Sequence, residues 1–215
     1  MSTAYRPAKP AEASVGEPPR ARGRRTRALI LERAAELFAA RGDDAVSVAE
    51  IAAAAGAHPN QITYYFTSKD GLFVHAAFRL LLRDAARLEP LGRRQRTPES
   101  FRLVLARAAL ALPTVPLAVR AMSIAGRRPE LRPVAEHNLA ILFRQADRYL
   151  AGVLHRRGWV VDRTPEAETR TFWSTVLGAR LISESGFGGR SDDIDLAGVL
   201  TIRSPDVSAD VSPDH

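Results

Sequence analysis

The sequence contains no cysteine, and this absence removes several kinds of chemistry at once. Without thiols the chain can form no disulfide, no cysteine-based zinc site and no thiol nucleophile. The chain also lacks any apolar run near the roughly 18 residues that a membrane helix needs. Its first 27 residues contain no apolar stretch typical of a signal peptide. We therefore expect a cytoplasmic protein with no membrane partner.

The sequence also lacks the short motifs that identify common catalytic and metal sites. Neither G-x-S-x-G nor a phosphate-binding P-loop occurs. The glycine-rich "GFGGR" (186–190) follows a helical pattern instead of a strand, and the negative charge of "SDDID" (191–195) suits a helix N-terminus. We predict that the protein is not an enzyme and holds no metal or cofactor. No metal-ligand spacing such as H-x-x-x-H is found among the five histidines, His58, His75, His137, His155 and His215.

Lysine is almost absent, because 29 of the 31 basic residues are arginine. The formal net charge is +7, and residues 1–27 alone carry seven basic residues against two acidic ones, a net charge of +5. Such an arm suits a polyanionic partner, either nucleic acid or an anionic membrane surface, but a solubilising tail explains it equally well. The Pro-, Ala-, Gly- and Arg-rich composition of residues 1–23 predicts a disordered arm.

Signals for β-strands are nearly absent, and apolar residues recur at helical spacing along most of the chain. The stretch "GWVV" (158–161) is too short to found a sheet, so we treat it as a loop. The fold class is therefore all-α, within a length that allows one large domain or a small domain joined to a larger one. About nine helices are expected from the helix-start and helix-stop residues, at roughly 26–41, 47–55, 58–66, 68–89, 97–113, 114–125, 130–157, 164–185 and 192–202.

Three short predicted helices near the N-terminus have the arrangement of a helix-turn-helix preceded by a supporting helix. "SVAE" places Ser47 at an N-cap and Glu50 three residues later, a capping box that satisfies two backbone amides. Gly56 lies in the turn, where a residue without Cβ lets two helices approach steeply. Pro59 stands at the first helical position, and the polar residues after it are free to enter a DNA major groove. The expected core of this unit is Leu31, Phe38, Ile51, Ala52, Ala55 and Ile62.

The segments "ILERAAELFAARG", "SVAEIAAAAGAHPNQITYYF" and "TSKDGLF", in this order, resemble the DNA-binding domain of TetR-type transcriptional regulators. The resemblance covers about residues 25–75. It implies a DNA-binding domain over residues 24–67 and a larger helical domain over 68–203, with a disordered basic arm before them (1–23) and a disordered tail after them (204–215). The matching features are Leu37-Phe38, Gly42, Ile51-Ala52, Ala55-Gly56, the aromatic residues Tyr64 and Phe66, and Ser68-Lys69.

The polar start of the third helix is the expected base-reading element. Asn60 and Gln61 can bond bidentately to adenine, and Thr63 can bond a base or touch a thymine methyl group. The resemblance points to Tyr64 and Lys69 as phosphate contacts, the lysine beside exposed amides at a helix start. The complete set of expected DNA contacts is Arg25, Arg27, Ser47, His58, Asn60, Gln61, Thr63, Tyr64, Tyr65 and Lys69.

Each of these signals has a plainer alternative when it is taken alone. Three consecutive aromatic residues more often pack in a core, which we expect for Phe66, and an Asn-Gln pair is usually solvated surface. The joint occurrence of the signals, with the basic arm ahead of them, favours DNA binding. The family more often has Gly-Thr at positions 60–61, Tyr at 63 and His at 65, so the resemblance supports DNA binding but carries over no operator sequence.

In TetR-type proteins the larger domain binds a small effector and dimerises, usually through the last two long helices. Here these helices would be residues 165–185 and 192–202, and large and small residues alternate on one face of the first. The expected dimer contacts are Phe172, Trp173, Val176, Leu177 and Ile182, and the alternative is that this face is buried within one subunit. The candidates for a ligand pocket between the fourth and eighth helices are His75, Met122, His137, Phe143, Arg144, Tyr149 and Trp173, each with structural packing or a surface position as its alternative.

We therefore expect a sequence-specific DNA-binding transcriptional regulator, a repressor by the habit of the family, released from a palindromic operator by an effector. Its partners would be double-stranded operator DNA, a second copy of the chain and a small molecule whose identity the sequence does not give. An alternative is a non-specific or architectural DNA-binding protein driven by the arginine-rich arm. Deletion of residues 1–23 separates the two, because only the regulator would keep its sequence preference.

Overall fold

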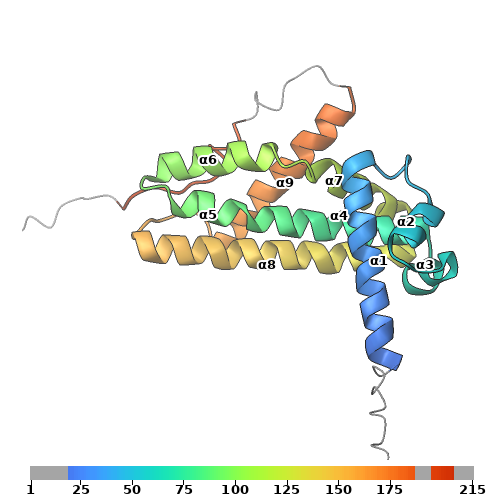
Figure 1. Cartoon of the computed structure of the whole chain (residues 1–215). Helices are drawn as coiled ribbons and strands as arrows, with labels where there is room; N and C mark the ends of the chain where they lie inside the picture. Colours follow the sequence, from blue (N-terminus) through green and yellow to red (C-terminus); the bar gives the residue numbers. More distant parts are fainter. Residues whose placement is uncertain (1–18, 187–194, 206–215) are drawn as a thin grey trace, which may run out of the picture.

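In the computed structural model, residues 19–186 and 195–205 are described, and these ranges form nine α-helices and one short 3-10 helix (Figure 1). Within the same ranges the only extended pairing is an isolated antiparallel bridge between Val160 and Arg203. The all-α fold class is confirmed. The elements are α1 (Pro19–Arg41), α2 (Val48–Ala54), α3 (Pro59–Phe66), α4 (Lys69–Ala86), α5 (Leu88–Arg93), α6 (Pro98–Leu110), α7 (Val115–Arg127), η1 (Pro129–Leu131), α8 (Arg132–Arg157) and α9 (Pro165–Glu184).

The first three helices, which we name the head, form the expected helix-turn-helix with its supporting helix. Gly56 in the turn has a φ of 58°, a conformation that residues with a Cβ rarely adopt. Pro59 opens α3 at its first position, as expected. The predicted core of the head is confirmed, since all of its members are buried: Leu31, Phe38, Ile51, Ala52, Ala55 and Ile62.

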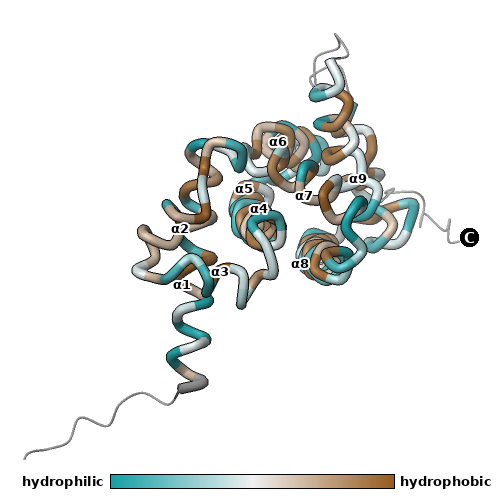
Figure 2. Tube along the Cα trace, turned by 90° about the vertical axis from the view of Figure 1, so that its right-hand side faces the viewer, coloured by the Kyte–Doolittle hydropathy of each residue, from teal (hydrophilic) through white to brown (hydrophobic). Residues whose placement is uncertain are grey.

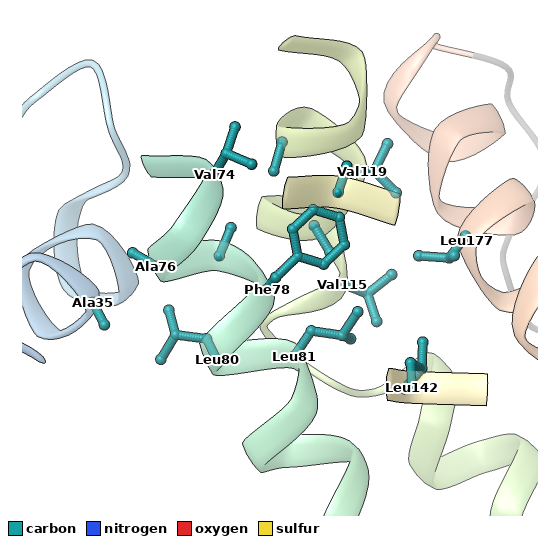
Figure 3. Packing of buried hydrophobic residues seen from close by; sticks show 14 of the residues in the cluster. Ala35, Val74, Ala76, Phe78, Leu80, Leu81, Val115, Val119, Leu142 and Leu177 are labelled. Carbon is teal, nitrogen blue, oxygen red and sulfur yellow. The ribbon is translucent and has the colours of Figure 1, made fainter. Parts of the chain in front are cut away.

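Helix α4 is the central element, because it packs against α1 on one side and against α7 and α8 on another. Figure 3 shows Ala76 and Leu80 of α4 on the side that faces Ala35 of α1, and Phe78 and Leu81 on the side that faces the later helices. One continuous cluster of buried apolar side chains extends from α1 to the C-terminal residues. The head and the later helices therefore share α4 as a common structural support.

The helices from α4 onward, which we name the body, lie side by side as a helical bundle. Figure 2 looks along α4 and α8 and shows α6, α7 and α9 packed beside them, with the head on the opposite side of α4. Helix α8, at 26 residues, ends at Gly158, whose φ of 66° closes the helix in the left-handed conformation. The head is thus held against one side and one end of the bundle (Figure 1).

The helices differ from the sequence prediction at the start of α1, within the predicted fourth helix and at the expected last helix. Helix α1 begins at Pro19 instead of near residue 26, so residues 19–23 are helical where the sequence predicts disorder. The predicted fourth helix is divided into α4 and α5, because Pro90 has no N–H to donate to the carbonyl of Ala86. The count of nine agrees with the prediction only because this additional helix replaces the expected last one.

The expected last helix is not formed in its described part, residues 195–202. Its backbone donors bind elsewhere in the chain instead: the amide of Thr201 donates to Glu168 at 2.9 Å, and that of Arg203 donates to Val160 at 3.0 Å. Sequence periodicity does not reveal such long-range partners. The disorder predicted for residues 1–18 and 206–215, and most of "GFGGR" and "SDDID", lie outside the described residues.

Among the described helices, no single one is long and apolar enough to span a membrane. Helices α6 and α7 reach that length and apolar character only as a pair, and the pair is bent by 64°.

Candidate DNA-reading surface and effector cavity

One face of α3 is polar and open to solvent. His58, Asn60 and Thr63 are exposed on it, and Tyr64, at 82%, is the most exposed of the large apolar and aromatic residues that the structure describes. Ile62 on the opposite face is buried and fixes the helix against the head core. The structure thus exposes at α3 four of the ten side chains expected to contact DNA.

Gln61 also helps to hold α3 in place. Its side-chain oxygen accepts a hydrogen bond from the backbone N–H of His58 at 2.9 Å. This bond satisfies an amide that the helix itself leaves without a partner. A bidentate contact between Gln61 and adenine uses the same oxygen, so this oxygen would have to accept a second hydrogen bond while it caps the helix.

The aromatic end of α3 packs on α1. Phe66 is buried, as expected, and the guanidinium of Arg27 lies 4.8 Å from its ring centroid. The hydroxyl of Tyr65 is close to α1, because a Cβ added at Gly23 would lie only 3.3 Å from it. Arg27 and Tyr65 therefore support the reading helix from behind, whereas Arg25 is exposed on α1.

The junction between α3 and α4 is a strained turn of three residues. Thr67 has a φ of 68°, and the N–H of Ser68 donates to the carbonyl of Phe66 at 2.7 Å, which makes a γ-turn centred on a β-branched residue. The carbonyl of Phe66 also lies against Gly71, where an added Cβ would come within 2.0 Å of the oxygen. Lys69 opens α4 directly after this turn, so the turn sets its place beside the reading surface.

The start of α2 shows the predicted capping box. The hydroxyl of Ser47 accepts from the N–H of Glu50 at 3.2 Å, and the Glu50 carboxylate accepts from the N–H of Ser47 at 2.8 Å. Arg41 at the end of α1 adds a 2.9 Å ion pair with Glu50. Hydrogen bonds from Ser47 foremost, and then Arg41, lower the pKa of Glu50 from its ordinary 4.5 to about 2.

Ion pairs connect the head to the body across an open groove. Arg120 of α7 lies 3.0 Å from Asp43 and 2.7 Å from Asp44, both in the loop between α1 and α2. Arg128, just after α7, lies 2.6 Å from Asp70 in the first turn of α4. Arg120, near the middle of α7, therefore binds the loop before α2, and Arg128, at the end of α7, binds the first turn of α4.

The body contains a mostly apolar cavity with a volume of ≈ 70 Å³, enclosed by the end of α4 and by α5, α6, α8 and α9. Tyr149 and Trp173, two of the residues predicted for a ligand pocket, line it. Phe172 lines it as well, although the sequence placed this residue in a dimer interface. Phe101, Leu142 and Leu200, which the sequence did not single out, complete its buried wall.

The other predicted pocket residues lie elsewhere. His75 packs edge-on against Phe66 at 5.5 Å between ring centroids, and burial foremost, followed by the charge of Arg27, lowers its pKa. Arg144 and His137 are exposed on α8. The two that remain, Met122 on α7 and Phe143 on α8, are partly buried against the main apolar cluster.

The predicted dimer contacts on α9 are mostly buried within the chain. Four of them, Phe172, Trp173, Val176 and Leu177, are at most 7% exposed, because this face of α9 packs on α7 and α8. The alternative of a face buried within one subunit therefore holds for these four. Ile182 is 50% exposed, and the neighbouring Leu181, which the sequence argument missed, is 54% exposed.

Gly71 is the functional-site residue that the sequence argument missed most clearly. A single glycine inside a helical pattern indicates a packing or functional constraint, and Gly71 stands within the quoted segment "TSKDGLF". The cavity residues Phe101, Leu142 and Leu200 gave no comparable signal, since they lie on three different segments and look like ordinary core residues.

A helix-turn-helix head with a polar, exposed third helix, joined by α4 to a body with an apolar cavity, defines a DNA-binding regulator that responds to a small ligand. Residues 30–76 match the family model described as bacterial regulatory proteins of the tetR family. Residues 98–201 match the C-terminal region of bacterial transcriptional repressors. The chain belongs to the TetR family of transcriptional regulators.

Solved structures agree with this assignment. A transcriptional regulator from Rhodococcus sp. RHA1 is 32% identical, with a TM-score of 0.67 over 80% of this chain and 91% of that one. A TetR-family regulator from Rhodococcus sp. shares the fold at 19% identity, with a TM-score of 0.58 over 81% and 96% of the two chains. The repressor FadR of Thermus thermophilus, solved with lauroyl-CoA, shares it at 22% identity, with a TM-score of 0.54 over 80% and 88%. No curated protein matches the chain.

Proposed function

We propose that the protein is a homodimeric cytoplasmic repressor that binds a palindromic operator through α3 and leaves it when an effector fills the cavity. The observation that carries this proposal is the position of α4. Its first turn follows the reading helix directly, and its last turn, with Ala85 and Ala86, lines the cavity. The two sites are thus the ends of one helix of 18 residues, about 27 Å long. We assign the protein a binding function and no catalytic one.

We assign base reading to Asn60 and Thr63, because both side chains are exposed near the start of α3. Tyr64 and Lys69 are assigned to phosphates, which fix the position of the helix without reading sequence. His58, Ser47 and Arg25 are exposed on the head and are assigned to the DNA backbone as well. Gln61, Tyr65 and Arg27 are assigned first of all to the support of the head.

We propose that dimerisation uses the exposed end of α9, where Leu181 and Ile182 form an apolar pair. A two-fold axis near this end would present the two α3 helices to successive major grooves, about 34–36 Å apart. An effector can shift the equilibrium only if it binds the released arrangement better than the DNA-bound one. In this proposal the cavity binds the effector more tightly in the released arrangement, and α4 transmits the change in the body to the head.

Fluorescence anisotropy with DNA from upstream of the protein's own gene, and with a scrambled duplex of equal composition, tests this function. Specific binding is expected to exceed non-specific binding by about 10³-fold or more. Equal binding to both duplexes with a steep salt dependence would overturn the proposal, since it indicates phosphate contact alone. Replacement of the exposed arginines Arg22, Arg24 and Arg25 by alanine removes basic charge from the arm, keeps residues that favour α1, and should lower affinity without loss of preference. Loss of nearly all binding would favour the arm-driven alternative.

Two pairs of variants assign the roles on α3 and α4. Asn60→Ala with Thr63→Ala should remove the preference for the upstream DNA while keeping non-specific binding. Lys69→Ala should weaken binding to both duplexes and reduce the salt slope by about 1. Arg94→Ala is the matched control for charge, because this exposed arginine lies between α5 and α6, at the far end of the body from α3 (Figure 1).

A further inference from the structure

The chemistry of the cavity walls defines what can bind there. Four aromatic rings contribute to the walls, that of Tyr149 and those of Phe101, Phe172 and Trp173, and the last three residues are at most 6% exposed. Aliphatic side chains from α4, α5, α6 and α8 complete them. Such walls gain free energy when they exclude water from apolar surface, and aromatic rings favour another flat ring. The body of the ligand is therefore apolar.

The polar groups at the cavity already have partners within the protein. The Glu89 carboxylate lies 2.8 Å from the guanidinium of Arg93, and the Tyr149 hydroxyl donates to the carbonyl of Glu89 at 3.0 Å. The hydroxyl of Thr169 donates to Asp147. Burial raises the pKa of Tyr149 to about 12, so this phenol stays neutral. A charged ligand would meet no free counter-ion on the described walls, and burial of an unpaired charge is costly.

Gln145 supplies a polar contact at the rim. It is exposed on α8 while it also lines the cavity, so it lies where the cavity meets solvent. A primary amide can both donate and accept a hydrogen bond, and it carries no charge. This chemistry suits a hydroxyl or carbonyl group on a ligand whose apolar part points inward.

The cavity is small, and Leu200 of the C-terminal segment forms part of its wall. Its volume of ≈ 70 Å³ is about half of the roughly 150 Å³ that admits benzene in an engineered cavity. Leu200 is held from both sides: Arg163 donates to the carbonyl of Val199 at 2.6 Å, and the Thr201 hydroxyl donates at 2.7 Å to Glu168, which is completely buried. This wall is fixed, so space for a ring must come from the rim at Gln145.

We propose that the effector is an uncharged molecule with an apolar body no larger than a single six-membered ring and one hydroxyl or carbonyl group. Leu200 sets the size limit, and Gln145 binds the polar group. The inference rests on the proposed function only where it treats this ligand as the effector, because binding itself can be measured without DNA.

Calorimetry on the full chain with benzyl alcohol, benzoate and benzylamine tests the charge preference on one ring size. Benzyl alcohol should bind at least about tenfold more tightly than either charged compound at about pH 7, a difference of about 1.4 kcal/mol. Equal or tighter binding of benzoate or benzylamine would overturn the proposal, and so would failure of all three compounds to bind. Gln145→Leu should lower the affinity for benzyl alcohol and leave that for toluene unchanged.

Leu200→Ala tests the size limit. The variant should bind 2-naphthol about tenfold more tightly than the natural chain does, with a much smaller change for benzyl alcohol. Leu103→Ala, which shortens an exposed leucine of α6 outside the cavity, should change neither affinity. Circular dichroism checks folding, and Leu200→Val gives a smaller enlargement should the alanine variant unfold. Unchanged naphthol affinity in a folded variant contradicts the assigned role.

The outcomes for ligand and DNA are separable. If the compounds bind in the expected order of affinity but the protein stays on its operator, the proposed ligand class is supported and its role as effector is wrong. A protein that prefers its upstream DNA but binds none of the neutral ring compounds would remain a regulator, and the ligand class would be wrong.

Discussion

At the residue scale, the contact between Phe66 and Gly71 is the tightest constraint next to the reading helix. A Cβ at position 71 would lie 2.0 Å from a backbone oxygen, and a backbone atom cannot yield as the end of a flexible side chain can. We expect Gly71→Ala to lower the free energy of unfolding by about 2–3 kcal/mol and to weaken operator binding, because the turn must open. Urea denaturation followed by circular dichroism measures the first effect.

Gly126→Ala is the matched control, since it makes the same change inside helix α7. Nothing lies within 4 Å of a Cβ added there, and the residue is exposed. Alanine is the better helix former, so this variant should be more stable by up to about 1 kcal/mol. If both variants shift stability in the same direction, the close approach of Phe66 to Gly71 does not constrain the junction.

Thr67 carries strain that glycine would relieve. A positive φ of 68° is unfavourable for a β-branched residue, and such strain is worth about 1–3 kcal/mol. Thr67→Gly should therefore raise the free energy of unfolding by about 1 kcal/mol. This is a net value, because glycine also gains conformational entropy in the unfolded chain, which opposes the relief of strain. Thr67→Ala keeps a Cβ and should give no comparable gain. A glycine variant that is less stable than the natural chain in urea would contradict this assignment.

At the scale of single elements, the capping box makes α2 sensitive to acid. The pKa of Glu50 falls from its ordinary 4.5 in the unfolded chain to about 2 in the folded one. The stabilisation is therefore complete above about pH 4.5 and is lost as the pH falls toward about 2. Glu50→Gln keeps an acceptor for the N–H of Ser47 but cannot ionise. Its melting temperature should be lower than that of the natural chain at neutral pH, and the two should converge as the pH approaches 2. A constant difference across this range would contradict the expectation.

Helix starts are the features that the sequence predicts best, because their causes are local. The box of Ser47 and Glu50, and the proline that opens α3, depend on residues within one helical turn. Residues 195–203 are the opposite case. Their conformation depends on Glu168 and Val160, more than 30 positions away, and the pattern of their own residues gives no sign of it.

At the scale of the whole molecule, the reading surface could be predicted and the cavity mostly could not. The side chains of α3 lie next to one another in the sequence, so one helical pattern brings them together. The cavity combines residues from α4 to the C-terminal segment, and only packing decides which apolar residues face it. Phe172 and Trp173 are an example. The pattern of large and small residues on α9 fits either a dimer interface or a face buried within the subunit, and these two residues are buried because α9 packs on α7 and α8.

The ion pairs of Arg120 with Asp43 and Asp44 give the head a second attachment to the body besides α4. Because the Arg120 side chain is 45% exposed, each pair contributes at most about 1 kcal/mol. We expect Arg120→Ala to free the loop between α1 and α2 while leaving the fold intact. Amide hydrogen exchange of residues 43–56, followed by mass spectrometry, should become up to about fivefold faster, with no change in α8.

Arg33→Ala is the control for this prediction. It removes an arginine of similar exposure whose partner, Glu36, lies on the same helix, so it breaks an ion pair without detaching the head. Faster exchange of residues 43–56 in the Arg120 variant alone would mean that α7 holds the head directly. A change in the body must then reach the operator by two routes, through α4 and through this loop. Equal exchange in both variants would leave α4 as the only attachment that matters.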